Sequence, residues 1–276
     1  MKLEAFETLA TGLDHPEGVA VGPDGRRVYA GGEAGQVYRI ADDGSPGELA
    51  TTGGFLFGVT LDGDGNVYAC DFGNASVMRI SAAGEVSTLS TGTPERPMRV
   101  PNFAAFDDAG NLYVTDSGPW GKDDGLIYRI APDGAASVWT ERTPRFPNGC
   151  CLSAAGDALL VVESHGRAVM RVPIANDGSA GTPELVADLT GSQPDGIALA
   201  EDGRMFVGCY RPDRVFEISP DGKANVWADD PDGVVLNQPA NVAFLDDRIV
   251  VSSLGGWNLM AAPAGTRGLP LRYPSP

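Results

Sequence analysis

The chain has 276 residues, 42% of them hydrophobic, and its 37 glycines and 21 prolines favour short strands joined by tight turns over long helices. Its 37 acidic and 20 basic residues give a formal net charge of −17, which repels phosphates and argues against nucleic acid or anionic lipid as a partner. There is no apolar run of ~20 residues and no apolar signal segment, so we expect a cytoplasmic protein without membrane contact.

The first predicted element is a strand at residues 4–10, and six copies of a repeating unit follow it. Each copy has an apolar strand, an acidic or glycine turn and a second strand, as in FGVTLDGDGNVYACD and PDGIALAEDGRMFVGCY. The residues that begin the first strand of each copy, which we call the anchor residues, are spaced by 40, 45, 46, 47 and 46: Glu17, Phe57, Asn102, Asn148, Asp195 and Asn241. A fixed period of roughly 40–50 residues is typical of propeller blades.

Third and fourth strands complete most copies, as LIYRI and ASVWTE do after the third anchor. The sixth copy ends after its third strand and continues into a Pro/Gly-rich tail at 261–276. The strand at 4–10 can supply the missing fourth strand, which would pair the open edges of the first and last sheets. We therefore predict an all-β, six-bladed β-propeller with four antiparallel strands per blade, closed by the N-terminal strand, as one domain over 1–276. We expect a monomer or a weak homodimer.

The anchor residues should form a ring around one mouth of the central channel, because the first strand of each blade lies nearest the axis. Five of the six are Glu, Asn or Asp. Crowded acceptor oxygens are costly unless something positive lies between them. Oxygen ligands suit Ca²⁺ best, with Mg²⁺ or Mn²⁺ also fitting. With only two histidines and no CxxC, Zn²⁺ is expected only as a substitute.

The motifs HPEGVA, PNG and QPDGIAL, in this order, resemble the senescence marker protein/gluconolactonase/luciferin-regenerating-enzyme-like family of calcium-dependent propellers. The resemblance covers residues 3 to about 260. It implies that Glu17, Asn148 and Asp195 are metal ligands and that Asn102 contacts metal or substrate. Arg99, one residue away from the place of an arginine in the family motif, is the corresponding candidate for gripping substrate.

These residues favour a metal-dependent hydrolase that acts on a lactone or a similar small ester. The ion would polarise the carbonyl group and activate water, and Asp195 is the first candidate for the catalytic base. The loops between second and third strands open on the same face as the anchors and should contact a small-molecule substrate. With Asn241 of the ring, the candidate substrate residues in these loops are Trp120, His165, Tyr210, Arg211 and Trp257.

Two other functions remain open from the sequence. A non-catalytic, ligand- or protein-binding propeller of the NHL type has a similar sequence repeat. Such a propeller needs no polar residues at equivalent positions around the axis. A metal-free enzyme of the strictosidine synthase type would use Glu163 as its catalytic carboxylate. Cation binding and the substitution Glu163→Gln distinguish these alternatives.

Overall fold

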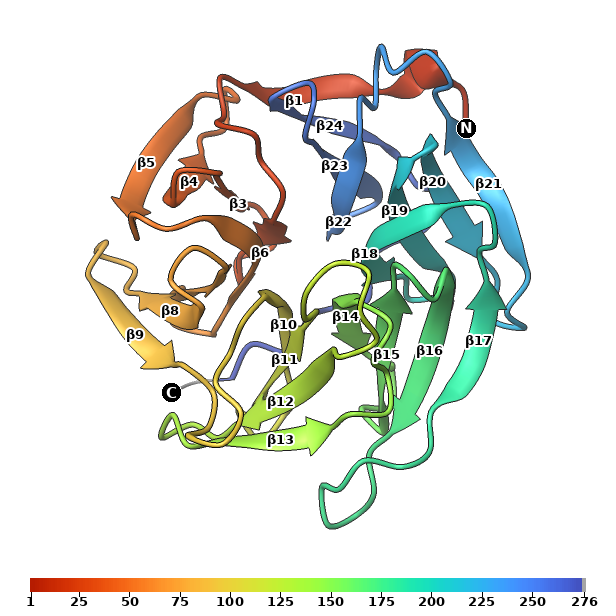
Figure 1. Cartoon of the computed structure of the whole chain (residues 1–276). Helices are drawn as coiled ribbons and strands as arrows, with labels where there is room; N and C mark the ends of the chain where they lie inside the picture. Colours follow the sequence, from red (N-terminus) through yellow and green to blue (C-terminus); the bar gives the residue numbers. More distant parts are fainter. Residues whose placement is uncertain (275–276) are drawn as a thin grey trace.

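Each of the six repeats folds into its own sheet. The computed structural model describes residues 1–274 and contains six four-stranded sheets. The sheets stand radially around a central axis, with their first strands innermost (Figure 1). The prediction of an all-β, six-bladed propeller with four antiparallel strands per blade is confirmed. Residues 275–276 of the expected tail lie outside the described residues.

The blades are numbered in chain order. Blade 1 contains β2 (Val19–Val21), β3 (Val28–Gly31), β4 (Gln36–Ile40) and β5 (Pro46–Thr51). Blade 2 contains β6 (Leu56–Leu61), β7 (Val67–Asp71), β8 (Ser76–Ile80) and β9 (Val86–Ser90). Blade 3 contains β10 (Pro101–Phe106), β11 (Leu112–Asp116), β12 (Leu126–Ile130) and β13 (Ala136–Thr140).

The second half of the chain repeats this order. Blade 4 contains β14 (Pro147–Leu152), β15 (Ala158–Glu163), β16 (Ala168–Pro173) and β17 (Glu184–Asp188). Blade 5 contains β18 (Gln193–Leu199), β19 (Met205–Arg211), β20 (Asp213–Ile218) and β21 (Ala224–Asp229). Blade 6 contains β22 (Pro239–Leu245), β23 (Arg248–Ser253), β24 (Asn258–Pro263) and β1 (Glu7–Thr11).

The N-terminal strand closes the ring as predicted. β1 pairs antiparallel with β24, where Glu7 lies opposite Ala261 and Thr11 opposite Asn258. The strand begins later than expected, because Leu3–Ala5 form one turn of 3₁₀-helix, η1. In residues 1–274 no helix has the length and apolar character needed to cross a membrane.

The core lies between neighbouring blades rather than inside any one of them. Toward the end of every innermost strand, one position holds a small residue, and these residues are Ala20, Thr60, Ala105, Cys151, Ala198 and Ala243. Larger side chains of the next blade pack against them, as Val59 and Leu61 do around Ala20 and Ile197 does against Cys151. Small residues are needed here because the sheets converge toward the axis.

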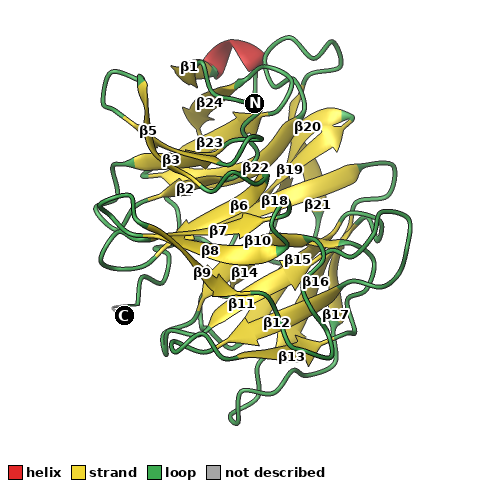
Figure 2. Cartoon of the chain, turned by 60° about the vertical axis from the view of Figure 1, so that its left-hand side comes forward, coloured by secondary structure: helices red, strands yellow, loops and turns green. Residues whose placement is uncertain are grey.

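The C-terminal tail crosses the face of the propeller opposite the anchor residues, which we call the far face. The Arg272 guanidinium contacts both carboxylate oxygens of Asp108 in blade 3, at 2.7 and 2.8 Å. The Tyr273 hydroxyl donates a hydrogen bond of 2.8 Å to the Val21 carbonyl in blade 1. Strands fill the body of the molecule and loops gather around its margins (Figure 2). The anchor residues and the loops between second and third strands share the opposite side, the anchor face.

Candidate metal centre

The anchor residues of blades 2 to 6 lie where their strands leave regular pairing. Each innermost strand pairs with the second strand of its blade, and in each the register shifts at the anchor. Such an irregularity kinks the strand and redirects a side chain. The shifts fall at Leu56/Val59, Pro101/Phe103, Pro147/Cys150, Pro194/Ile197 and Pro239/Val242.

Glycines after the anchors let neighbouring innermost strands come unusually close. A Cβ atom on Gly149 would lie 2.6 Å from the Cα atom of Gly196 and 2.7 Å from the carbonyl oxygen of Asp195. A Cβ atom on Gly196 would in turn collide with the side chain of Asn241. The glycines therefore hold the anchors of blades 4, 5 and 6 side by side.

Four buried oxygen atoms at this level have no hydrogen-bond partner in the described part of the chain. They come from four consecutive blades and are the Oδ1 atoms of Asn102, Asn148, Asp195 and Asn241. The four residues are at most 3% exposed. Buried acceptors without partners are costly and rare in native proteins. Oxygen atoms of this kind are the ligands of hard divalent cations, so the donor set fits Ca²⁺ or a similar ion.

The two carboxyl groups of the ring interact with one another. Burial raises the pKa of Glu17 well above its usual value, and the nearby charge of Asp195 raises it further. Burial also raises the pKa of Asp195 to about 7, although the neighbouring Asn148 amide opposes the rise. Glu17, Asn148 and Asp195 therefore lie close enough to interact, and a cation bound between them would favour the ionised carboxylates.

Hydroxyl groups tie the predicted ligands to the preceding blades. The Ser252 hydroxyl of blade 6 donates to the main-chain carbonyl of Glu17 at 2.5 Å, and the Thr115 hydroxyl of blade 3 donates to that of Asn148 at 2.8 Å. Sequence reasoning missed both residues. The signal was present, since both are hydroxyl residues at the anchor-face end of a second strand.

Ser164 links two predicted ligands at once. Its hydroxyl accepts a 3.1 Å hydrogen bond from Asn148 Nδ2 and donates one of 2.7 Å to the carbonyl of Pro194, the residue before Asp195. Ser164 therefore engages the nitrogen of the Asn148 amide, and the Oδ1 atom of the same amide has no partner within residues 1–274.

Tyr210 is the predicted substrate residue most strongly coupled to the carboxylates. It lies at the end of β19 and is partly buried. Burial raises the pKa of its phenol, and the charges of Asp195 and Glu17 raise it further. The hydroxyl is therefore protonated at neutral pH and able to donate a hydrogen bond at the site.

The other predicted substrate residues occupy loops of the anchor face. Trp120 packs on His165, with ring centroids 3.9 Å apart. Burial lowers the pKa of His165, so this imidazole is neutral at neutral pH. Arg211 and Trp257 are exposed at the ends of loops in blades 5 and 6.

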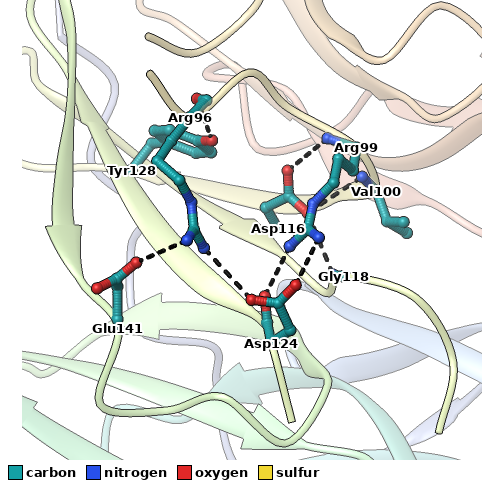
Figure 3. A network of polar contacts seen from close by, with 8 residues as sticks. All are labelled: Arg96, Arg99, Val100, Asp116, Gly118, Asp124, Tyr128 and Glu141. Carbon is teal, nitrogen blue, oxygen red and sulfur yellow. Dashed lines mark hydrogen bonds and ion pairs between the residues drawn. The ribbon is translucent and has the colours of Figure 1, made fainter. Parts of the chain in front are cut away.

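Arg99 is held by acidic neighbours at the edge of blade 3 (Figure 3). Its Nη1 atom pairs with the Asp124 carboxylate at 2.6 Å, and Nη2 donates to the Asp124 carbonyl at 2.7 Å. Its main-chain N–H donates to Asp116 at 2.7 Å, and Arg96 approaches Asp124 from the other side at 3.5 Å. This network holds the β11–β12 loop in place. It also engages the Arg99 guanidinium, which was expected to bind substrate, in contacts with Asp124.

Other parts of the described chain do not offer a competing centre. Across residues 1–274, no three His, Cys, Asp or Glu side chains gather as a metal cluster, and the candidate centre instead combines two carboxylates with amide oxygens.

A cavity of about 840 Å³ lies on the far-face side of the anchors. Innermost strands of all six blades and tail residues 267–273 line it, but none of the six anchor residues does.

The fold and the site together define a six-bladed propeller with a polar centre at its axis. The chain belongs to the SMP-30/gluconolactonase/LRE-like family, whose defining region matches residues 82–245. Residues 1–40 match the N-terminal region of strictosidine synthase-like proteins. The sequence is also 28% identical over 235 residues to Protein STRICTOSIDINE SYNTHASE-LIKE 3 of Arabidopsis thaliana. That match covers 71% of this chain but only 59% of the relative's length.

Solved structures share the fold over almost the whole chain. A gluconolactonase from Xanthomonas campestris has a TM-score of 0.80 at 20% identity, covering 94% of this chain and 89% of its own. The calcium-binding protein regucalcin from Agrobacterium tumefaciens has a TM-score of 0.75 at 16% identity, covering 97% and 95%. A luciferin-regenerating enzyme has a TM-score of 0.76 at 16% identity, covering 97% and 99%. Most of the similar structures are named as enzymes.

Proposed function

We propose that this protein is a metal-dependent hydrolase that opens a lactone or a similar small ester. The observation that supports the proposal is the set of four unpartnered, buried oxygens on the innermost strands of blades 3 to 6, with the coupled carboxyl group of Glu17 close to Asp195. Family membership supports the same reaction class, and the calcium-binding and gluconolactonase structures with this fold support the cation and the lactone.

Glu17, Asn148 and Asp195 would hold the ion, with Asn102 and Asn241 adding amide oxygens. A divalent cation in this position supplies a Lewis acid for the ester carbonyl and lowers the pKa of water. Asp195 would accept the proton of the attacking water on a free carboxylate oxygen. A C–O bond would form from that water, the ring C–O bond would break, and the leaving alkoxide would take the proton that Asp195 had accepted from the water.

Calorimetric titration with Ca²⁺ tests the binding half of the proposal. The wild-type protein should bind one ion, while Asp195→Asn and Glu17→Gln should weaken binding at least tenfold. The control Glu48→Gln removes an exposed carboxylate from outer strand β5 and should leave the affinity unchanged. Failure of the wild-type protein to bind any divalent cation would favour a non-catalytic propeller.

Hydrolysis of a lactone panel tests the chemical half. Turnover should appear with Ca²⁺, Mn²⁺ or Mg²⁺, disappear after chelation and return when the ion is restored. Asp195→Asn should abolish turnover while circular dichroism and the melting temperature remain those of a folded protein. Turnover that persists in chelator would contradict the proposal.

The strictosidine synthase-like match supports a second candidate, a metal-free site around Glu163. However, Glu163 is only 3% exposed, and its carboxylate accepts a 2.8 Å hydrogen bond from the main-chain N–H of Arg145. A carboxylate used in this way supports the loop before Asn148. The geometry therefore favours the axial centre.

A further inference from the structure

Exposed aromatic side chains are confined to one type of loop. Among residues 1–274, three aromatic residues are strongly exposed: Phe72 at 42%, Trp120 at 52% and Trp257 at 54%. All three lie between the second and third strands of their blades, on the anchor face. Large exposed apolar side chains gathered on one face mark a binding surface, whereas scattered ones need no explanation.

Blade 2 places an aromatic cluster inside the anchor ring itself. Phe57 occupies the anchor position that is polar in the other blades, and its ring stacks on Phe72 with centroids 5.3 Å apart and an interplanar angle of 13°. Phe55 packs edge-on against both, at 5.2 and 5.9 Å. The backbone of Phe57 lies against Gly18, the residue after Glu17. One wall beside the predicted ligands is therefore apolar and aromatic.

A second aromatic cluster stands beside Asn148. Trp120 packs edge-on against His165 and Phe146, at 3.9 and 4.7 Å. Phe146 lies two residues before Asn148 with a positive φ of 60°, and His165 directly follows Ser164, the hydrogen-bond partner of Asn148. The imidazole is neutral because burial lowers its pKa. This cluster therefore presents an uncharged aromatic surface that is coupled to a predicted ligand.

We propose that the substrate of the axial centre carries a flat aromatic ring next to its ester, as an aromatic lactone does. This inference rests on the proposed hydrolase function. Aromatic walls stack on a planar ring in offset or edge-to-face geometry. They offer few partners to the hydroxyl groups of a sugar lactone, which would lose hydrogen bonds to water without replacing them. The centre therefore selects aromatic over polyhydroxylated lactones.

Kinetics with matched lactones test this selectivity. The calcium-loaded protein should hydrolyse dihydrocoumarin with a kcat/KM at least tenfold above that for glucono-1,5-lactone. Phe72→Leu and Trp120→Leu should each lower kcat/KM for dihydrocoumarin about tenfold and lower that for δ-valerolactone, which has no aromatic ring, by a smaller factor. The control Leu185→Ala alters a 63% exposed side chain on outer strand β17 and should change neither. A preference for glucono-1,5-lactone would overturn the inference and leave the hydrolase proposal standing.

A binding measurement separates ring recognition from catalysis. Chroman has the fused rings of dihydrocoumarin but no carbonyl group, so it cannot be hydrolysed. Saturation-transfer NMR should detect chroman on the Asp195→Asn variant, and the additional change Trp120→Leu should abolish the signal. Chroman binding without hydrolysis of any lactone would support aromatic recognition and reject the hydrolase. Chroman binding that survives both Trp120→Leu and Phe72→Leu would overturn the inference.

Discussion

The side-chain oxygens of residues near the axis differ in whether neighbouring groups donate hydrogen bonds to them. The Oδ1 atoms of Asn102 and Asn241 are buried without a partner within residues 1–274, whereas nearby Asp116 accepts hydrogen bonds from the main-chain N–H groups of Arg99 and Val100. A carboxylate saturated by N–H groups supports a loop, but unpartnered oxygens are available to a ligand. The lack of hydrogen-bond donors to its oxygens distinguishes the candidate centre from a carboxylate such as Asp116, which serves a structural role.

Glu163 gives a prediction about pH. Burial raises its pKa above the usual 4.5, although the N–H and guanidinium of Arg145 oppose the rise. For an acid with a raised folded-state pKa, the stabilising contribution is complete below the unfolded value and is lost as pH rises through the folded value. We therefore expect Glu163→Gln to gain stability relative to wild type between pH 4.5 and pH 7.5.

Urea unfolding at both pH values measures this change. The comparison should be made in chelator, so that cation binding does not contribute to stability. Asp133→Asn, a change in an exposed turn, serves as the control and should show no such gain. If the stability difference between Glu163→Gln and wild type is the same at both pH values, the carboxyl group does not titrate in this range on folding.

At the scale of the strand, the bulges and glycines make the centre possible. A regular strand alternates its side chains between the two neighbouring blades and would direct none to the axis. The register shifts at the anchors break this alternation. Gly149 and Gly196 then allow blades 4, 5 and 6 to meet closely.

Gly149→Ala tests this close approach. Its Cβ atom would meet main-chain atoms of Gly196 and Asp195, which cannot move without shifting β18. We expect a loss of about 1–3 kcal/mol in the free energy of unfolding, as is typical of overpacked positions. Calorimetry should also show weakened Ca²⁺ binding.

The matched control is Gly47→Ala in the outer strand β5. A Cβ atom there would have only an ordinary contact of 3.6 Å with the Arg39 carbonyl. This variant should keep both stability and cation affinity. Equal stability of the two variants would show that the innermost strands have room to separate.

The whole molecule depends on closure of the ring by β1. This strand covers the edge of β24, Phe6 beside it packs on Trp227 at 5.7 Å, and Ala10 is 2% exposed. An unpaired strand edge invites aggregation. Closure also sets the distance between Glu17 in blade 1 and the ligands of blades 4 and 5.

Deletion of residues 1–12 should lower both the soluble yield and the melting temperature. Loss of the Phe6 side chain alone removes about 3 kcal/mol. At roughly 2–4 °C per kcal/mol for a chain of this size, the melting temperature should fall by at least ~6 °C. Differential scanning calorimetry measures the change. Removal of only Met1 and Lys2, both exposed, is the control, and an unchanged melting temperature in the longer deletion would reject closure by β1.

The sequence was enough to predict the number of blades, their strands, the closing strand and the ring of anchor residues. These features follow from a fixed period and from alternating apolar positions, which are local properties of the chain. The prediction that Glu17, Asn148 and Asp195 hold one ion together rests on the same reasoning, since equivalent positions of a closed ring converge at its axis. The sequence also showed that Phe57 is the one apolar anchor residue, but it did not show that Phe72 stacks on it.

Only the tertiary structure decided features that depend on contacts between distant segments. In the folded chain Arg99 pairs with Asp124, and the tail lies across the far face. The hydroxyls of Ser252 and Thr115 form hydrogen bonds between blades. No local pattern encodes these contacts, because each depends on how closely neighbouring sheets pack and where their loops end. The sequence therefore determined which residues surround the axis, and the packing of the blades determined which of their atoms remain free to bind.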